Sequence, residues 1–361
     1  MLRLGREHRS RNEEPSKQTR RNSPIWVHGR SVAVAEPASA LRPGLRHIIG
    51  AMDRLQRRDS NWRLRTRNLE LGARTLVMGV VNITPDSFSD GGLFLDPEAA
   101  VAEALRHLDE GADLVDLGAE STRPNSRVSS RGGVADSSAA SAVTAELEQA
   151  RLLPALEGVL AVRPGAIVSV DTYKAATARA ALAAGAEIVN DVSGFTWDAE
   201  MAGVCAEFKS GVVLMHTRGL PEHWRTQTQL PADELLAAVR GGLEASLAAA
   251  ARAGISPEAI VLDPGYGFGK RFGENYVLLA RQAELLSLGR PLLAGLSRKS
   301  FLGHTLAPLL GGVQAPVAAR ETAGIAAMVA AILNGASMVR VHSVRPAVEA
   351  ALIADAVLAA H

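Results

Sequence analysis

Eight short runs rich in β-branched and aliphatic residues alternate with longer stretches of helical spacing along most of this 361-residue chain. Such alternation is typical of parallel sheets, and eight repeats match the strand count of a (β/α)8 TIM barrel, which usually needs about 250 residues. The stretches between them are rich in Ala, Leu and Glu, as in 97–108, 175–183, 233–253 and 318–333. The expected strands are 75–81, 114–117, 167–170, 188–192, 212–215, 260–262, 292–295 and 338–341.

The junctions between helices and strands support the same fold. Three of them begin with Gly-Ala, at Gly111, Gly185 and Gly335. Glycine there can adopt the left-handed conformation that ends a helix, so that the chain turns directly into the next strand. We therefore predict an α/β fold with one (β/α)8 barrel domain over residues 59–361. A doubly wound open sheet remains an alternative, because a strand count does not prove closure.

Residues 1–58 differ from the rest of the chain. They hold 13 Lys and Arg against 5 Asp and Glu, whereas the whole chain is almost balanced at 39 against 38. They also lack a sustained periodic pattern of apolar residues. The excess of basic residues and the missing pattern together predict a poorly ordered basic extension. A nucleic-acid-binding arm or a transit peptide would be the functional alternatives, and Glu7, Glu13 and Glu14 argue against the transit peptide.

Composition excludes several classes of protein. A single Cys cannot form a disulfide within the chain, and 47% hydrophobic residues are too many for a disordered polyelectrolyte. No apolar run approaches the roughly 18 residues of a membrane span. The N-terminus lacks the apolar core of a secretory signal. We expect a cytoplasmic protein with neither a membrane nor a nucleic-acid partner.

Polar residues lie at the carboxyl ends of all eight expected strands. In a (β/α)8 barrel, chemistry takes place at the carboxyl ends of the strands. A helix cap or a turn explains one Asp or Asn at such a position, and His216 alone could be a core histidine. These explanations do not account for polar groups at every strand end. The residues are Asn82, Asp116, Asp171, Asn190, His216, Asp263, Ser297–Lys299 and Arg340–His342.

Four of these residues suit a flat, polar heterocycle. Asp171, Asn190 and Asp263 offer carboxylate and amide groups that match the amino, ring N–H and carbonyl groups of such a ring. Lys299 can bond a ring nitrogen or carbonyl from the opposite side. The sequence therefore predicts a heterocycle pocket inside the barrel mouth.

A second set suits an anion. Arg340, His342 and Arg123 can bind phosphate, and the loops after strands seven and eight are the usual phosphate site of these barrels. Asn82 offers one neutral oxygen, which suits Mg²⁺, an ion that keeps several waters and binds substrate phosphates. No His or Cys cluster has zinc spacing.

A glycine-rich segment follows the sixth expected strand. It reads Gly-Tyr-Gly-Phe-Gly-Lys over 265–270 and is similar to a phosphate loop. Pro264 precedes it and no Ser or Thr follows Lys270, so the spacing of a Walker motif is not met.

Several long motifs, in order, resemble the dihydropteroate synthase family. The resemblance covers the chain from about Trp62 to the C-terminus, and the most specific motif is Met-Gly-Val-Val-Asn-Ile-Thr-Pro-Asp-Ser-Phe-Ser-Asp-Gly-Gly over 78–92. The others are Asp-Leu-Gly-Ala-Glu-Ser-Thr-Arg-Pro (116–124), Val-Asp-Thr-Tyr-Lys (170–174), Asn-Asp-Val-Ser-Gly (190–194), Leu-Met-His (214–216), Leu-Asp-Pro-Gly-Tyr-Gly-Phe-Gly-Lys (262–270), Ser-Arg-Lys-Ser-Phe-Leu-Gly (297–303) and Arg-Val-His (340–342).

The resemblance implies a transferase of folate synthesis. Such an enzyme joins 4-aminobenzoate to 6-hydroxymethyl-7,8-dihydropterin diphosphate, which yields 7,8-dihydropteroate and diphosphate. It also implies a homodimer formed through late barrel helices. The implied roles are pterin binding by Asp171, Asn190, Asp263 and Lys299, Mg²⁺ binding by Asn82, diphosphate binding by Thr122, Arg340 and His342, aminobenzoate-side or loop contacts by Arg123 and Ser297, and closure over the ring by Phe88. Catalysis is expected of Asp171, Lys299, Arg340 and His342.

The chain departs from the family at a few positions. Ser343 stands where the family usually has Asp, and Asn125 where it commonly has Gly. The segment 125–141 is longer and richer in Ser and Gly than usual. A carboxylate beside His342 would favour the imidazolium form, so Ser343 bears on the charge of that ring.

Two other functions remain open. A folate-dependent methyltransferase barrel shares the pterin-holding acids and Asn but does not need the diphosphate residues. A catalytically silent pterin-binding paralogue would be expected to lose lid or anion residues. The presence of Asn82, 84–92, 297–299 and 340–342 favours the synthase.

Overall fold

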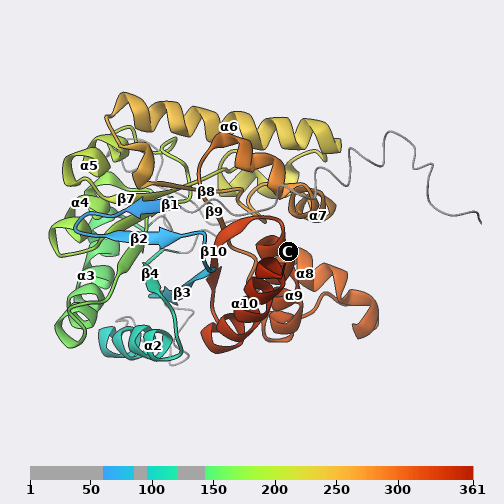
Figure 1. The fold of residues 1–361 in the computed structure, drawn as a ribbon, viewed down its shortest axis with the longest axis horizontal. Helices are drawn as coiled ribbons and strands as arrows, with labels where there is room; N and C mark the ends of the chain where they lie inside the picture. The colour runs from blue at the N-terminus through green and yellow to red at the C-terminus, as the bar shows by residue number, and fades with distance from the viewer. Residues whose placement is uncertain (1–59, 85–95, 121–142, 361) are drawn as a thin grey trace, which may run out of the picture. The chain divides into compact units, whose positions relative to one another are not determined.

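Eight parallel strands close into a barrel in the computed structural model, which describes residues 60–84, 96–120 and 143–360 (Figure 1). Neighbouring strands are bonded in the order β10-β3-β4-β5-β6-β7-β8-β9, so the predicted (β/α)8 barrel is confirmed and an open sheet is excluded. The strands are β3 (Leu76–Asn82), β4 (Leu114–Gly118), β5 (Val168–Asp171), β6 (Ile188–Asp191), β7 (Gly211–Met215), β8 (Ile260–Asp263), β9 (Leu292–Ala294) and β10 (Ala336–Val341). The extension predicted for 1–58 lies outside the described residues.

Helices surround the barrel (Figure 1). They are α2 (Pro97–Asp109), α3 (Ala145–Val162), α4 (Ala175–Ala183), α5 (Met201–Phe208), α6 (Ala232–Arg252), α7 (Phe272–Ala280), α8 (Ser300–Thr305), α9 (Glu321–Leu333) and α10 (Val344–Ala359). Short 3₁₀ turns are η1 (Pro221–Thr226), η2 (Pro257–Ala259), η3 (Gln282–Leu288), η4 (Ala307–Leu310) and η5 (Val317–Arg320). Among the described helices, none has the length and apolar content needed to cross a bilayer.

The Gly-Ala junctions have the predicted backbone conformation. Gly111, Gly185 and Gly335 have φ angles of 102°, 115° and 93°. An L-residue with a Cβ rarely adopts such angles, so glycine lets each helix end and the next strand begin with only two to four residues between them.

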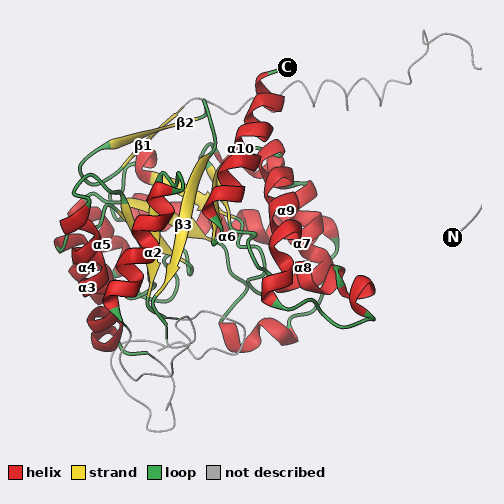
Figure 2. Cartoon of the chain, turned by 90° about the horizontal axis from the view of Figure 1, so that it is seen from below, coloured by secondary structure: helices red, strands yellow, loops and turns green. Residues whose placement is uncertain are grey.

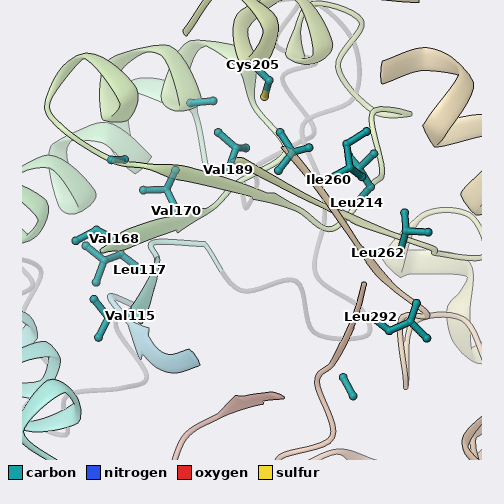
Figure 3. Packing of buried hydrophobic residues seen from close by; sticks show 14 of the residues in the cluster. Val115, Leu117, Val168, Val170, Val189, Cys205, Leu214, Ile260, Leu262 and Leu292 are labelled. Carbon is teal, nitrogen blue, oxygen red and sulfur yellow. The ribbon is translucent and has the colours of Figure 1, made fainter. Parts of the chain in front are cut away.

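Successive side chains of each strand point alternately toward the surrounding helices and toward the barrel interior. The outward residues pack under the helices in the main core, where Figure 3 shows Val115, Leu117, Val168, Val170, Val189, Leu214, Ile260, Leu262 and Leu292. A separate cluster takes its residues from all eight strands or the position directly before one, which places it in the interior. Its strand members are Leu76, Met78, Leu114, Ile167, Ile188, Val213, Val261, Leu293 and Met338.

An antiparallel hairpin covers the amino-terminal end of the barrel (Figure 2). It consists of β1 (Ser60–Arg63) and β2 (Asn68–Leu71). Its buried side chains Trp62 and Leu64 belong to the interior cluster, and the Trp62 Nε1–H donates to the carbonyl of Ala259, directly before β8, at 2.9 Å. The sequence alone does not predict this hairpin, because its four-residue strands carry only a weak apolar pattern.

Candidate active site

The barrel interior changes from apolar to polar toward the carboxyl ends of the strands. Asp116 on β4, Asp171 on β5, Asn190 on β6, Asp263 on β8 and Arg340 on β10 follow the apolar interior residues at a spacing of two to four positions. Since side chains alternate along a strand, the same spacing aims these polar groups into the interior. Strands β5 and β6 pair Asp171 with Asn190 in register. The structure thus brings together residues that lie far apart in the sequence.

Arg340 links the acids on β4 and β5 within this set of interior polar residues, which we call the polar layer. Its Nε–H donates to Asp116 Oδ2 at 2.6 Å, and its Nη2–H donates to Asp171 Oδ2 at 2.6 Å. Asn190 Nδ2–H donates to the same Asp116 oxygen at 3.0 Å. Asp116 is fully buried, and no group among the described residues forms a hydrogen bond with its Oδ1. The sequence places Asp116 at a strand end without giving it a role, and the structure shows that it holds both Arg340 and Asn190.

Burial perturbs the charges of this layer. It raises the pKa of Asp171 and that of Asp263, although Arg340 opposes the shift at Asp171 and the Gly265 N–H opposes it at Asp263. Burial lowers the pKa of Lys299 to about 8, with Asp263 opposing. Carboxylates that lack water in this way gain most from N–H donors of a ligand. The layer is therefore suited to a polar, hydrogen-bonding ring.

Two glycines leave space beside the carboxylates. A Cβ on Gly118, at the end of β4, would lie 3.4 Å from Asp171 Cβ. A Cβ on Gly295, after β9, would lie 3.8 Å from Asp263 Oδ2. A side chain at either position would therefore lie directly against one of the two acids.

Lys299 enters the site from the start of α8. Its Nζ lies 3.9 Å from the centre of the Phe268 ring, which follows β8. Asp263, Asp171 and Arg340 all influence its charge, so it lies near the acids on β5 and β8. That Lys299 approaches a bound ring from the side opposite the acids stays a prediction.

A cavity of about 350 Å³ opens beside the ends of β3 and β10. Asn82 and His342, which the sequence assigns to Mg²⁺ and to the diphosphate respectively, line it, whereas Arg340 faces the barrel interior. Arg298 also lines it and has a φ angle of 59°, which a bulky residue rarely adopts. The remaining lining residues are Val80, Glu103, Arg106, Glu110, Glu321, Ser343, Arg345 and Pro346. The sequence gives Arg298 no role, although it stands inside the 297–299 motif.

His342 is neutral in this environment. Burial holds its pKa well below the usual value, and the nearby Arg298, Arg340 and Lys299 lower it further. Ser297 Oγ lies 3.1 Å from His342 Nδ1 and also accepts from the His342 backbone N–H at 3.3 Å. When the serine hydroxyl donates to Nδ1, the ring proton is on Nε2. The ring can then donate one hydrogen bond to an anion without carrying charge.

The other predicted strand-end histidine has a different setting. His216 is buried, and burial lowers its pKa to about 2. A Cβ on Gly242 of α6 would lie 2.4 Å from its Cδ2, so the ring packs between the barrel and that helix. It is the core histidine considered from the sequence. Phe88, Thr122 and Arg123 fall outside the described residues.

The chain matches a family of pterin-binding barrels. Residues 78–342 match the family described as "Pterin binding enzyme". This range runs from β3 to the end of the last barrel strand and contains the whole polar layer. The fold and the site together define a pterin-binding enzyme of the (β/α)8 class.

Similar proteins identify the family to which the chain belongs within this class of pterin-binding enzymes. The dihydropteroate synthase of Mycobacterium leprae is 42% identical over 280 residues, which is 78% of this chain and 92% of the relative. That of Escherichia coli is 37% identical over 285 residues, 79% and 92% of the two chains. A solved Xanthomonas albilineans dihydropteroate synthase with 4-aminobenzoic acid is 38% identical, has a TM-score of 0.71, and is matched over 84% of this chain and 99% of that one. The chain belongs to the dihydropteroate synthase family, a family of transferases in folate biosynthesis.

Proposed function

We propose that the polar layer of this barrel and the adjoining cavity carry out the synthase reaction of the family. In that reaction, 4-aminobenzoate displaces diphosphate from 6-hydroxymethyl-7,8-dihydropterin diphosphate and forms 7,8-dihydropteroate. The observation that carries the proposal is the meeting of Asp171, Asn190, Asp263 and Lys299 with Arg340 inside one end of the barrel.

The pterin ring would lie against the acids. Asp171 and Asp263 would accept hydrogen bonds from its amino and ring N–H groups, and Asn190 can both donate and accept. Lys299 would donate to a ring nitrogen or carbonyl. The spaces beside Gly118 and Gly295 support this position, because they leave the acids accessible. A solved relative from Coxiella burnetii, 30% identical with a TM-score of 0.70, is in complex with pteroic acid.

The diphosphate would occupy the cavity at the ends of β3 and β10. His342 Nε2–H would donate to it, and Arg340 would reach it from the polar layer. Thr122 is the third group assigned to it. Arg298, which lines the same cavity, adds a positive charge.

Mg²⁺ fits the donor set of this cavity. Among the described residues, no group of three or more His, Cys, Asp or Glu forms a metal site, and Asn82 supplies a single side-chain oxygen. Mg²⁺ keeps several waters and takes its other ligands from substrate phosphates, so one protein oxygen is sufficient. When bound, the ion would neutralise charge on the leaving diphosphate.

The chemistry needs stabilisation of charge more than a covalent nucleophile. As the methylene C–O bond breaks, its electron pair leaves with the diphosphate, which Arg340 and His342 stabilise. Asp171 and Asp263 stabilise the positive charge left on the electron-rich pterin. The amine nitrogen of 4-aminobenzoate then bonds to the methylene and loses a proton, and here position matters more than activation. Cys205 is buried in α5 with a pKa raised to about 12, which agrees with a reaction without a thiolate.

A homodimer in the cytoplasm completes the proposal. Large apolar side chains are exposed on the segment between α8 and α9, with Leu309 80% and Val313 69% exposed. Exposed apolar patches of this kind on a folded surface are typical of protein–protein contacts. Sedimentation equilibrium should give twice the chain mass, and Leu309→Glu should weaken the association.

The direct test is synthesis of dihydropteroate. Purified protein, the pterin diphosphate, labelled 4-aminobenzoate and Mg²⁺ should give labelled dihydropteroate and diphosphate in equal amounts. A methyltransferase would give none but would transfer a methyl group from methyltetrahydrofolate. A silent paralogue would bind pterin and give neither product, and either result would overturn the proposal.

A further inference from the structure

Lys270 has no part in the proposed chemistry, and its environment is unusual for a lysine. It closes the glycine-rich segment after β8, and only 6% of it is exposed. Its Nζ donates to three backbone carbonyls, those of Gly265 at 2.8 Å, His216 at 3.1 Å and Phe268 at 3.3 Å. The lysine of a phosphate loop points toward its ligand, whereas this one turns back into its own segment and onto the end of β7.

The shape of the segment depends on these bonds. Gly265, Gly267 and Gly269 have φ angles of 72°, 83° and 70°, so the chain folds back on itself and turns carbonyls inward. A Cβ on Gly265 would lie 1.9 Å from the carbonyl oxygen of His216, which shows how closely the segment approaches β7. The three N–H groups of an ammonium match the three carbonyls. Lys270 therefore connects the segment to the barrel.

The segment touches Lys299 at two places. The Phe268 ring lies 3.9 Å from Lys299 Nζ, and a Cβ on Gly267 would lie 3.2 Å from Lys299 Cδ. Phe268 also packs edge-to-face against Trp224, with ring centres 5.0 Å apart. The position of the Lys299 ammonium thus depends on where Phe268 is held.

We propose that Lys270 is a positioning residue, which fixes Phe268 against Lys299 and so places the Lys299 ammonium on the pterin ring. The inference rests on the proposed function, because it assumes that Lys299 binds the pterin. Lys270 does not contact the pterin in this account.

Burial disfavours the charge of Lys270. Burial lowers its pKa to about 7, Lys299 and Arg218 lower it further, and Asp263 and Glu274 oppose the shift. An apolar side chain of similar length would fill the same volume without this penalty, and such replacements of buried charges are often neutral for stability. Lys270→Met therefore separates a positioning role from simple packing.

The test measures pterin affinity in a double-mutant cycle. The variants are Lys270→Met, Phe268→Leu and the double variant, and the matched control is Arg271→Met, which removes a cation from the next, exposed position. Binding of 6-hydroxymethylpterin is followed by calorimetry, KM for the pterin diphosphate and kcat by steady-state assay, and folding by urea unfolding.

We expect Lys270→Met to weaken pterin binding about tenfold, the size of effect of a lost charged hydrogen bond, and to raise KM more than it lowers kcat. The loss should be much smaller in the Phe268→Leu background, and Arg271→Met should bind as the wild type does.

Wild-type affinity in Lys270→Met, or the same fold-loss in both backgrounds, would overturn the inference. If Lys270→Met does not fold, Phe268→Leu alone decides, because wild-type pterin affinity in that variant would remove the proposed link. A folded wild type that binds no pterin would instead overturn the proposed function.

Discussion

The amino-terminal and carboxyl-terminal halves of the barrel interior use the same strands and opposite kinds of side chain. On β8, Val261 lies in the apolar cluster and Asp263, two positions later, lies in the polar layer. The hairpin with Trp62 covers the apolar half, whereas the loops follow the polar half. Asp116, Asn190 and Asp263 are buried like the apolar cluster, so solvent contact does not explain why they are polar. The difference shows that a closed barrel can carry unfavourable charge at one end when the other end is packed tightly.

Burial disfavours several charges of the polar half. Burial raises the pKa of both Asp171 and Asp263 and lowers that of Lys299, which means that the folded protein disfavours all three charges. Such groups lower stability unless a ligand or a partner compensates them. The apolar half therefore supplies stability, and the polar half supplies function.

Charge placed in the apolar half should prevent folding. Val261→Asp buries a carboxylate with no partner, which is expected to lower the free energy of unfolding by about 5 kcal/mol or more. Urea unfolding followed by circular dichroism measures the loss. The reverse change two positions later, Asp263→Val, should leave the protein folded, and equal stability of the two variants would contradict the comparison.

Removal of charge from the polar half should abolish activity and preserve the fold. Asp171→Ala and Lys299→Ala are each expected to lower kcat/KM for dihydropteroate formation about a thousandfold, which corresponds to roughly 4 kcal/mol of transition-state stabilisation. Their unfolding free energies should stay within about 1 kcal/mol of the wild type. Normal turnover in both variants would show that the residues are wrongly assigned.

Loss of the hairpin contact should reduce stability and leave pterin binding unchanged. Trp62→Ala removes a fully buried indole and its bond to Ala259, and we expect a loss of about 3 kcal/mol. Trp62→Phe, which keeps most of the packing, should lose about 1 kcal/mol. Pterin affinity of the folded Trp62→Ala protein should equal that of the wild type. A large change in affinity would mean that the hairpin acts on the distant site.

The activity should fall in alkaline solution. Burial lowers the pKa of Lys299 to about 8, so its ammonium is lost as the pH rises through 8, and kcat/KM should decrease above that pH. In Lys299→Arg, whatever its rate, this decrease should move upward by more than about two pH units, because arginine stays protonated. The unfolded chain binds this proton with the ordinary pKa of 10.5, so the wild type should gain stability between about pH 8 and 10.5. An unchanged alkaline limb in Lys299→Arg would exclude Lys299 as its source.

Restoration of the family carboxylate beside His342 should have the smallest effect. Ser343→Asp would raise the pKa of a histidine that is now neutral. We expect kcat/KM to change by no more than about threefold, because the neutral ring already offers an N–H to the diphosphate. A matched Ser343→Asn variant controls for size. A tenfold gain with Asp alone would mean that the imidazolium form is the active one.

Much of this architecture is predictable from local patterns. The eight strands and the Gly-Ala junctions depend on neighbouring residues, and the structure confirms them within one or two positions. The strand-end acids are predictable because parallel barrel strands all end at one face. Asp171 and Asn190, for example, become register partners once the barrel closes.

The remaining features depend on contacts that no local pattern contains. Trp62 of the hairpin donates a hydrogen bond to a carbonyl 197 residues away in the sequence. Arg340 donates hydrogen bonds to Asp116 and Asp171, which are 224 and 169 residues away. The role of Lys270 is hidden for the same reason, since its carbonyl partners follow from the path of the backbone. Sequence motifs identify these residues as unusual but do not tell which group each one binds.

Pterin binding by Asp263→Asn tests the central assignment most directly. Asparagine keeps the size of the side chain and removes its charge, so folding and function can be measured on the same protein. Calorimetry with 6-hydroxymethylpterin should give one site per chain in the wild type and at least about tenfold weaker binding in the variant, with an unchanged unfolding free energy. Equal affinity in the two folded proteins would contradict the account.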